Sequence, residues 1–254
     1  MIDTHCHLTD ERLATQVGAV IARARDAGVT KLISIGTSLD DSIATVEACR
    51  GRDAVRCAVG VHPNYCQNEV FERLNLLRGL SADPSVVALG EMGLDYHHEF
   101  ADRTLQTTFF QAQLQIAGDL NKPVVIHCRE ATNDTLAILS GFPRVRAVFH
   151  CFTGTVDEAR RILDAGYLLG FTGPITYKNN DDLRSAVRLC PTDRMLVETD
   201  APYLSPEPVR KQKTCEPAFV MYTAQKVAEI KQTTLQDVDQ FTTDNAQELF
   251  GWGA

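Results

Sequence analysis

The sequence predicts a (β/α)8 TIM barrel, an α/β fold in which eight parallel strands alternate with helices. The length of 254 residues is usual for one closed barrel. Eight short runs rich in Val, Ile and Leu recur along the chain, as strands buried on both faces should. A helix-like stretch follows each run. An open doubly wound sheet is the alternative, but it more often has five or six strands.

The first half of the chain contains four predicted strand–helix pairs. The strands lie near residues 1–7, 31–37, 55–61 and 86–91, and the helices near 10–27, 40–50, 69–82 and 102–120. Asp40 and Asp41 precede the second helix, where acidic residues favour a helix start. Gly28 and Gly79 stand where the first and third helices should stop.

The second half repeats the pattern. The strands lie near residues 123–128, 146–152, 167–172 and 195–200, and the helices near 132–140, 156–165, 181–189 and 217–230. Thr155 and Glu158 form a capping-box pattern, and Gly166 marks the end of that helix. An additional C-terminal helix is expected near 235–250. We see no linker or low-complexity tract, and we expect a single hydrolase barrel domain over residues 1–254.

Composition narrows the classes of function. A net charge of −8 disfavours broad, non-specific attraction to nucleic acid but leaves room for a locally basic site. No apolar run approaches the roughly 18 residues of a membrane span, and the chain does not begin like a signal peptide. We therefore expect a cytoplasmic protein with no membrane contact and no obligate protein partner. Most of the eight cysteines are expected to be reduced, buried thiols.

Imidazoles and carboxylates gather where the predicted strands end. They are His5, His7, His62, Glu91, His127, His150 and Asp200. Chemistry in a barrel sits at the carboxyl ends of the strands, so these residues should converge on one mouth. Such groups are the usual ligands of divalent ions. His5 and His7 are two apart on one strand, so both point to the same side. The pattern predicts a metal site.

The candidate ligands suggest a site for two ions. Glu91, in the middle of the strand order, could bridge ions roughly 3.5–4 Å apart, although a carboxylate paired with a cation is the alternative. His127 and His150 could hold the second ion with Glu91. Asp200 could ligate the first ion and also receive a proton from the attacking water. Glu91 and Asp200 are thus the candidate catalytic residues.

Other polar residues lie beside the candidate ligands or deeper in the predicted barrel. We favour substrate contact for His62 over metal ligation or helix capping. His97 and His98 follow the fourth strand and are expected to be surface histidines. Strand parity places Asp3 and Glu198 deeper in the barrel, either orienting ligands or forming structural ion pairs.

Seven motifs in order carry a family resemblance. They are DTHCHL, GVHP, GEMGLD, HCREA, HCFTGT, FTGP and ETDAPYL, across residues 3–204. Together they resemble the TatD family of metal-dependent deoxyribonucleases, within the amidohydrolase-like barrels. The resemblance implies hydrolysis of DNA phosphodiesters, chiefly as a 3′-to-5′ exonuclease.

The resemblance also implies roles for residues. His5, His7, Glu91 and Asp200 match the ligands of one ion, and Glu91, His127 and His150 match those of the other. His62 matches a histidine near substrate phosphate. Many amidohydrolase barrels bridge their ions with a carboxylated lysine, but no predicted strand has a lysine near its carboxyl end, so the bridge should be Glu91.

One departure concerns the loop after the eighth strand. Many members of the family have Arg-Asn-Glu-Pro there, whereas this chain has Thr214-Cys215-Glu216-Pro217. The missing arginine puts phosphate contacts in that loop in doubt. Arg210, Lys211 and Lys213 lie close by in the sequence and are candidates to compensate.

The favoured function is DNA phosphodiester hydrolysis, with two divalent ions (Mg²⁺, Mn²⁺ or Zn²⁺) activating water. The acidic total favours single-stranded or frayed 3′ ends as the substrate. Candidate substrate contacts are His62, Arg129, Tyr203 and Arg210, with Lys178 a further cation; core packing is favoured for Phe152. The alternative is a metal-dependent ester or amide hydrolase of small molecules on the same barrel, since fold alone does not fix the substrate.

Overall fold

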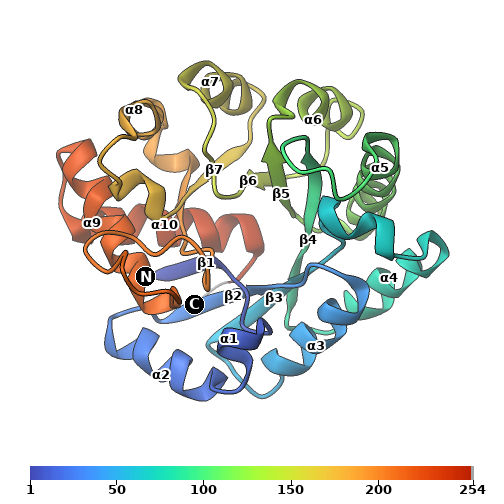
Figure 1. Cartoon of the computed structure of the whole chain (residues 1–254), viewed down its shortest axis with the longest axis horizontal. Helices are drawn as coiled ribbons and strands as arrows, with labels where there is room; N and C mark the ends of the chain where they lie inside the picture. The colour runs from blue at the N-terminus through green and yellow to red at the C-terminus, as the bar shows by residue number, and fades with distance from the viewer. Residues whose placement is uncertain (253–254) are drawn as a thin grey trace. The chain divides into compact units, whose positions relative to one another are not determined.

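The computed structural model describes residues 1–252 and has the predicted fold class, an α/β barrel of parallel strands (Figure 1). The strands follow one another in the sheet in chain order, from β1 to β8. Their bounds are β1 Ile2–Cys6, β2 Lys31–Ile35, β3 Val55–Val59, β4 Val86–Asp95, β5 Val124–Arg129, β6 Ala147–Phe149, β7 Leu168–Phe171 and β8 Met195–Val197.

Helices connect successive strands, and two more follow β8. They are α1 Glu11–Ala14, α2 Val17–Asp26, α3 Leu39–Cys49, α4 Leu76–Leu80, α5 Arg103–Leu120, α6 Thr132–Leu139, α7 Val156–Asp164, α8 Asp181–Leu189, α9 Val220–Lys231 and α10 Leu235–Phe250. Short 3₁₀ helices precede three of them: η1 Pro63–Asn68 and η2 Phe71–Asn75 before α4, η3 Gly173–Thr176 before α8, and η5 Pro217–Phe219 before α9. A further one, η4 Thr192–Arg194, precedes β8. Within residues 1–252, none of these helices combines the length and apolar character that a bilayer crossing requires.

The chain divides into two compact units. Unit 1 comprises Met1–Ser34 and the chain from Cys151 onward, and unit 2 comprises Ile35–His150. One domain over residues 1–254 stays a prediction, and its last two residues lie outside the described part of the chain.

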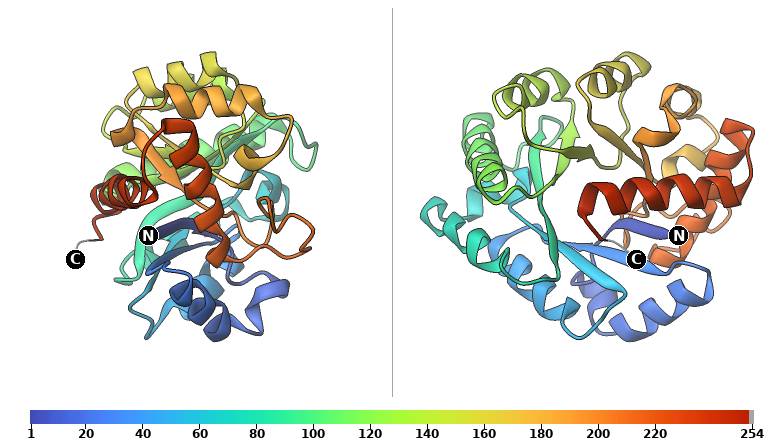
Figure 2. Two further views of the ribbon diagram at one scale, coloured as in Figure 1. Left: turned by 90° about the vertical axis from the view of Figure 1, so that its left-hand side faces the viewer. Right: turned by 180° about the vertical axis from the view of Figure 1, so that it is seen from behind.

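The additional C-terminal helix, α10, is present in unit 1. It packs against β1 and β8, and the right-hand view of Figure 2 shows it beside the N-terminal strand. The Asn245 side-chain amide donates to the carbonyls of Thr192 and Met195, 2.7 and 2.8 Å away, at the start of β8. These bonds anchor the helix at the amino end of the strand, away from the carboxyl ends.

In unit 1, the end of β8 runs beside the end of β1. Cys6 and Ala201 form a parallel bridge, and the backbone N–H of His7 donates to the Ala201 carbonyl over 2.7 Å. The backbone N–H of Asp200 donates to the His5 carbonyl over 2.9 Å. The segment after β8 is therefore hydrogen-bonded to the residues that carry the two N-terminal histidines.

In unit 2, glycines let β4 lie close to its neighbours. A Cβ on Gly60 would come within 2.7 Å of the Gly90 backbone, and one on Gly93 within 2.0 Å of the His127 carbonyl oxygen. Gly93 also has a φ of +142°, which L side chains rarely adopt. Glycine at these positions therefore lets the β4 backbone pass close to β5, beside His127.

Several boundaries differ from the sequence-based expectation. The stretch 10–27 forms two helices, α1 and α2, and much of 69–82 is 3₁₀ helix. Gly79 does not end a helix but lies inside α4. The α3 helix begins one residue before Asp40, because the Ser38 hydroxyl accepts from the N–H of Asp41 and caps it.

Other local predictions are confirmed. Thr155 and Glu158 form both bonds of a capping box at α7. Gly28 and Gly166 follow α2 and α7 with φ near +90°. All eight cysteines are free, and six of them are buried.

Candidate metal centre

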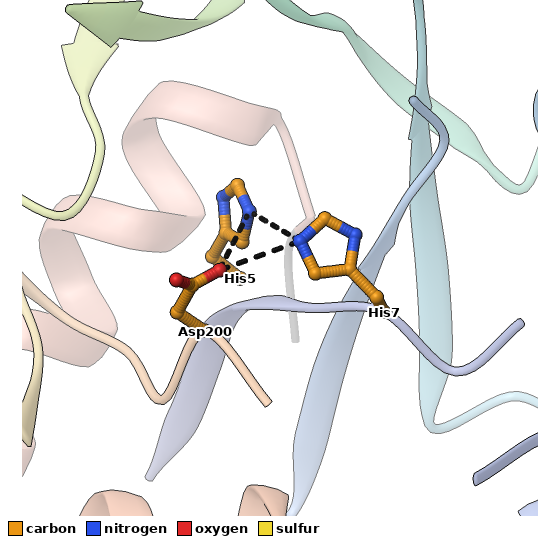
Figure 3. Close-up of side chains that lie close together, drawn as sticks. All are labelled: His5, His7 and Asp200. Atoms are coloured by element: carbon orange, nitrogen blue, oxygen red, sulfur yellow. Dashed lines mark hydrogen bonds and ion pairs between the residues drawn. The ribbon is translucent and has the colours of Figure 1, made fainter. Parts of the chain in front are cut away.

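Two imidazoles and one carboxylate converge in unit 1 (Figure 3). The Nε2 atoms of His5 and His7 lie 3.3 Å apart, and the Asp200 Oδ1 atom lies 3.6 and 3.3 Å from them. Donor atoms held about 2.0–2.1 Å from a tetrahedral ion lie about 3.4 Å from one another. The three donors, which we call the β1–β8 cluster, therefore fit a divalent ion.

Strand geometry explains this arrangement. His5 lies in β1 and His7 directly follows it, so alternation turns both rings to the same side. Asp200 has a φ of +59°, in the left-handed region that aspartate tolerates better than most residues. This conformation occurs where the Asp200 backbone is bonded to β1.

Asp3 holds the segment that carries Asp200 through hydrogen bonds to Thr199. It is fully buried and accepts from the Thr199 N–H over 2.9 Å and from the Thr199 hydroxyl over 2.6 Å. Burial raises the pKa of Asp3 to about 8, against the lowering effect of these bonds. Asp3 thus fixes the residue before Asp200, in line with the orienting role considered from strand parity.

Glu198 is also buried, as parity predicted. One carboxylate oxygen accepts from the Cys151 N–H over 2.5 Å, and the other accepts from the Thr4 hydroxyl over 3.2 Å. Both partners are neutral donors of unit 1. Glu198 therefore ties Thr4 of β1 and the backbone of Cys151 to the segment that leads from β8 to Asp200.

A second group surrounds Glu91 in unit 2. The Glu91 Oε1 atom lies 2.9 Å from His127 Nδ1 and 2.5 Å from His150 Nε2. The two ring nitrogens lie 3.5 Å apart. We call Glu91, His127 and His150 the β4–β6 cluster, since they lie on β4, on β5 and directly after β6. These donors also have the spacing of metal ligands.

Electrostatics in the β4–β6 cluster favour an ionised carboxylate. Burial alone raises the pKa of Glu91, but His150 and His127 outweigh it and hold the pKa well below its usual value. Burial lowers the pKa of His127, yet the hydrogen bonds with Asp95 and Glu91 outweigh this, and the pKa is raised. A buried, ionised carboxylate among imidazoles is a site prepared for positive charge.

Asp95 is a residue that the sequence interpretation missed. It is buried, and its Oδ2 atom lies 3.0 Å from His127 Nε2. One nitrogen of His127 thus faces Glu91 and the other faces a carboxylate that holds the ring, an arrangement typical of metal-bound histidines. The signal was present in the motif GEMGLD, because Asp95 lies four residues after Glu91.

His62 differs from the other histidines. Its Nδ1 atom accepts from the backbone N–H of Asn64 over 3.0 Å, so the neutral ring carries its proton on Nε2. Burial and the neighbouring His127 lower the pKa of His62 to about 3, which keeps the ring neutral. Its Nε2 lies 3.6 Å from Glu91 Oε1. His62 therefore presents an N–H donor that suits contact with an anion, and its ring nitrogen also lies close enough to Glu91 and His127 for the three to hold an ion.

The predicted substrate contacts lie in different surroundings. Tyr203 is half-exposed, and its ring meets the His7 ring edge-on at 6.0 Å. Arg129 is exposed at the end of β5, two residues after His127. Arg210 stacks over Tyr177 at 3.8 Å, and Lys178 is exposed beside that tyrosine. Phe152 is buried, as its predicted core role requires.

The loop that departs from the family pattern is anchored without the missing arginine. Glu216 accepts two hydrogen bonds from the guanidinium of Arg23 on α2, over 2.6 and 2.9 Å. The backbone N–H of Cys215 donates to the Pro202 carbonyl over 3.0 Å. The glutamate of this stretch therefore fixes the loop to α2.

His97 and His98 each contact a carboxylate. His98 Nδ1 lies 3.0 Å from Asp95 Oδ2, and His97 Nδ1 lies 2.7 Å from Glu130 Oε1. Both rings are partly exposed, but His98 shares its carboxylate partner with His127. Both histidines lie at the surface, as expected, but the sequence interpretation overlooked the contact of His98 with Asp95.

Comparison with known proteins supports a common origin. A family model described as "TatD related DNase" matches residues 2–251. The hydrolase YabD of Bacillus subtilis, described as uncharacterised and metal-dependent, is 37% identical over 98% of both chains. The 3′-5′ ssDNA/RNA exonuclease TatD of Pantoea ananatis is 37% identical over 99% of both chains.

A solved structure agrees with these relatives. YjjV, a TatD homologue from Escherichia coli K12, superposes with a TM-score of 0.93 at 26% identity, covering 99% of this chain and 98% of that one. The matched length, the fold and the two clusters of metal-ligand type lead to one conclusion: the chain belongs to the TatD family of metal-dependent hydrolases.

Proposed function

We propose that the chain is a 3′-to-5′ exodeoxyribonuclease that uses two divalent ions and acts on single-stranded or frayed DNA ends. The observation that carries the proposal is the presence of two clusters, each combining imidazoles with a carboxylate at ligand spacing. Relatives of the same length that are named as 3′-5′ ssDNA/RNA exonucleases support the choice of substrate.

Each cluster would hold one ion. Divalent ions supply Lewis-acid stabilisation of phosphoryl charge and lower the pKa of water. His5, His7 and Asp200 would bind the first ion, and Glu91, His127 and His150 the second. That Glu91 bridges both ions stays a prediction. Imidazole-rich ligation suits Mn²⁺ or Zn²⁺ as well as Mg²⁺.

The remaining residues would handle the substrate. Asp200, the more exposed carboxylate, is suited to take the proton of the attacking water. The Nε2–H of His62 would donate to a phosphate oxygen. Arg129 and Arg210 would neutralise phosphates, and Tyr203 would contact the strand beside His7.

A labelled-oligonucleotide assay tests the proposal. Single strands carrying a 5′ label are incubated with the purified protein and Mg²⁺, Mn²⁺ or Zn²⁺. Stepwise shortening from the 3′ end is expected, together with its loss in EDTA. A strand blocked by a 3′ phosphorothioate is the matched substrate control and should resist shortening.

The same preparation can decide against the proposal. Intact oligonucleotides beside rapid cleavage of an acyl ester, amide or lactone would show a small-molecule hydrolase instead. Full metal content in the inactive sample would remove the objection that the protein had lost its ions.

A further inference from the structure

An exposed aromatic pair lies just after β4. The rings of His98 and Phe100 are nearly parallel, with an interplanar angle of 15° and centroids 5.4 Å apart. Phe100 is 62% exposed, more than any other large apolar residue among those described. Because one face of the phenyl ring stacks on His98 and the ring stays exposed to solvent, it offers a preformed surface on which another flat ring can stack.

The segment that carries this pair is held by one buried carboxylate. Asp95 Oδ1 accepts from the backbone N–H groups of His97 and His98 over 3.0 and 2.9 Å, and Oδ2 from the His98 ring over 3.0 Å. His97 meets His98 edge-on, with centroids 4.8 Å apart. The orientation of the His98 ring is therefore fixed from two sides.

The pair is connected to the β4–β6 cluster by direct contacts. The Asp95 oxygen that holds His98 also holds His127. The backbone N–H of Tyr96 donates to the Arg129 carbonyl over 2.9 Å, which ties the segment to the end of β5. The Arg129 side chain is exposed and forms no ion pair with another described residue. An aromatic ring beside an available cation is the combination that single-stranded nucleic acid sites use.

Size and charge favour a nucleobase over a protein partner. Two rings offer far less apolar area than the roughly 800 Å² per partner of a stable protein interface. Two nearby carboxylates are engaged by the segment itself: Glu130 pairs with His97, and Asp134 accepts from the Tyr96 hydroxyl over 2.7 Å. They therefore oppose an approaching phosphate less than free carboxylates would, whereas Glu99, between His98 and Phe100, is exposed, so the pair suits the base of a strand rather than its phosphate.

We propose that Phe100, supported by His98, is a stacking platform for one base of a single strand whose phosphate the β4–β6 cluster receives. The inference rests on the proposed function and deepens it by naming a base subsite. Stacking needs no particular base, so this subsite suits an enzyme that removes nucleotides in any sequence.

Binding of a non-cleavable strand tests the platform. A fluorescein-labelled single strand with phosphorothioate linkages is titrated with the wild type, Phe100→Ala and Phe100→Trp, and anisotropy is measured. Phe100→Ala should raise Kd about tenfold or more, and Phe100→Trp should keep it near the wild-type value. Phe71→Ala, which removes a half-exposed phenyl ring elsewhere in unit 2, is the control and should leave Kd unchanged.

An abasic strand isolates the base. When the three 3′-terminal nucleotides lack bases, the wild type should bind as weakly as Phe100→Ala binds the normal strand. Phe100→Ala should cause no further loss on the abasic strand. An equal effect on both strands, or unchanged binding by a Phe100→Ala protein with normal melting, would overturn the platform.

Cleavage of an unmodified strand by the same proteins separates the two proposals. If binding depends on Phe100 but the strand is not shortened, the stacking role of Phe100 is supported and the proposed nuclease activity is contradicted. If the strand is shortened and Phe100→Ala leaves KM unchanged, the nuclease activity is supported and the stacking role of Phe100 is contradicted.

Discussion

The two clusters present the same chemistry in different settings. In the β1–β8 cluster, one strand supplies both imidazoles, and the Asp200 side chain is 14% exposed. In the β4–β6 cluster, the ligands come from three successive strands, and the Glu91 side chain is 3% exposed. Asp95 additionally orients His127. From this comparison we predict that Asp95, by orienting His127, makes ion binding by the β4–β6 cluster tighter than ion binding by the β1–β8 cluster.

The largest expected effect comes from Glu91→Ala. Activity should fall about a thousandfold or more, because the buried carboxylate of the β4–β6 cluster is removed. Measuring the metal content of the variant refines the result. Loss of one ion per chain would mean that Glu91 binds a single ion, and loss of two would mean that it bridges both. Glu47→Ala, at an exposed glutamate of α3, is the control. Near-wild-type turnover would rule out a central role for Glu91.

Asp200→Asn should rank second. Asparagine keeps the shape and the backbone bonds but cannot take up the proton, so kcat should fall about a hundredfold or more. The melting temperature should change little, since the side chain is partly exposed. Asp193→Asn, at an exposed position of unit 1, is the matched control. A large loss of stability with unchanged kcat would mean that Asp200 has a structural role and not a catalytic one.

Asp95→Asn tests why the clusters differ. Removing the charge that orients His127 should lower metal affinity or activity about 10- to 100-fold, with Asp95→Ala more severe. Equilibrium dialysis against Mn²⁺ gives the affinity, and Asp134→Asn is the control. Unchanged affinity would show that the β4–β6 cluster owes nothing to this carboxylate.

The smallest expected effect comes from Asp10→Asn, near Tyr203 and the β1–β8 cluster. The hydrogen bond from Arg12 lowers the pKa of Asp10 to about 2, and Tyr203 contributes. Because the folded-state pKa is depressed, the stabilisation is present above about pH 4 and is lost as the pH falls toward 2. Asp10→Asn should therefore destabilise the protein at pH 7 by roughly 0.2–1 kcal/mol, as exposed ion pairs do.

Urea unfolding at pH 7 and at pH 2.5 checks this last prediction. The difference in free energy of unfolding between the wild type and Asp10→Asn should be smaller at pH 2.5 than at pH 7. A difference of the same size at both pH values would mean that shape, not charge, is responsible. Asp157→Asn, at an exposed position of α7, controls for a general charge effect.

Much of the fold and of both clusters could be predicted because apolar runs and strand alternation are local signals. His5 and His7 lie together because one strand places them two apart. The predicted fourth strand ended at Glu91, whereas β4 continues to Asp95. Its register shifts between Leu89 and Met92, where Gly90 and Glu91 interrupt the apolar run, so periodicity gave no reason to extend the strand.

The missed residues depend on contacts that no periodicity encodes. Asp95 acquires its role from three partners: the loop backbone, His98 and His127. The proton position on His62 depends on the N–H of Asn64, two residues away in a 3₁₀ turn. Both are consequences of loop conformation, which residue types alone do not specify.

The two roles of Asp95 have a thermodynamic consequence. One carboxylate anchors both His127 and the segment with His98 and Phe100, so ordering either side restricts the other. If an ion at His127 improves strand binding by some factor, a bound strand must improve ion affinity by the same factor. A protein arranged in this way would hold its ion most firmly while engaged with substrate, and would release both more readily once the strand is consumed.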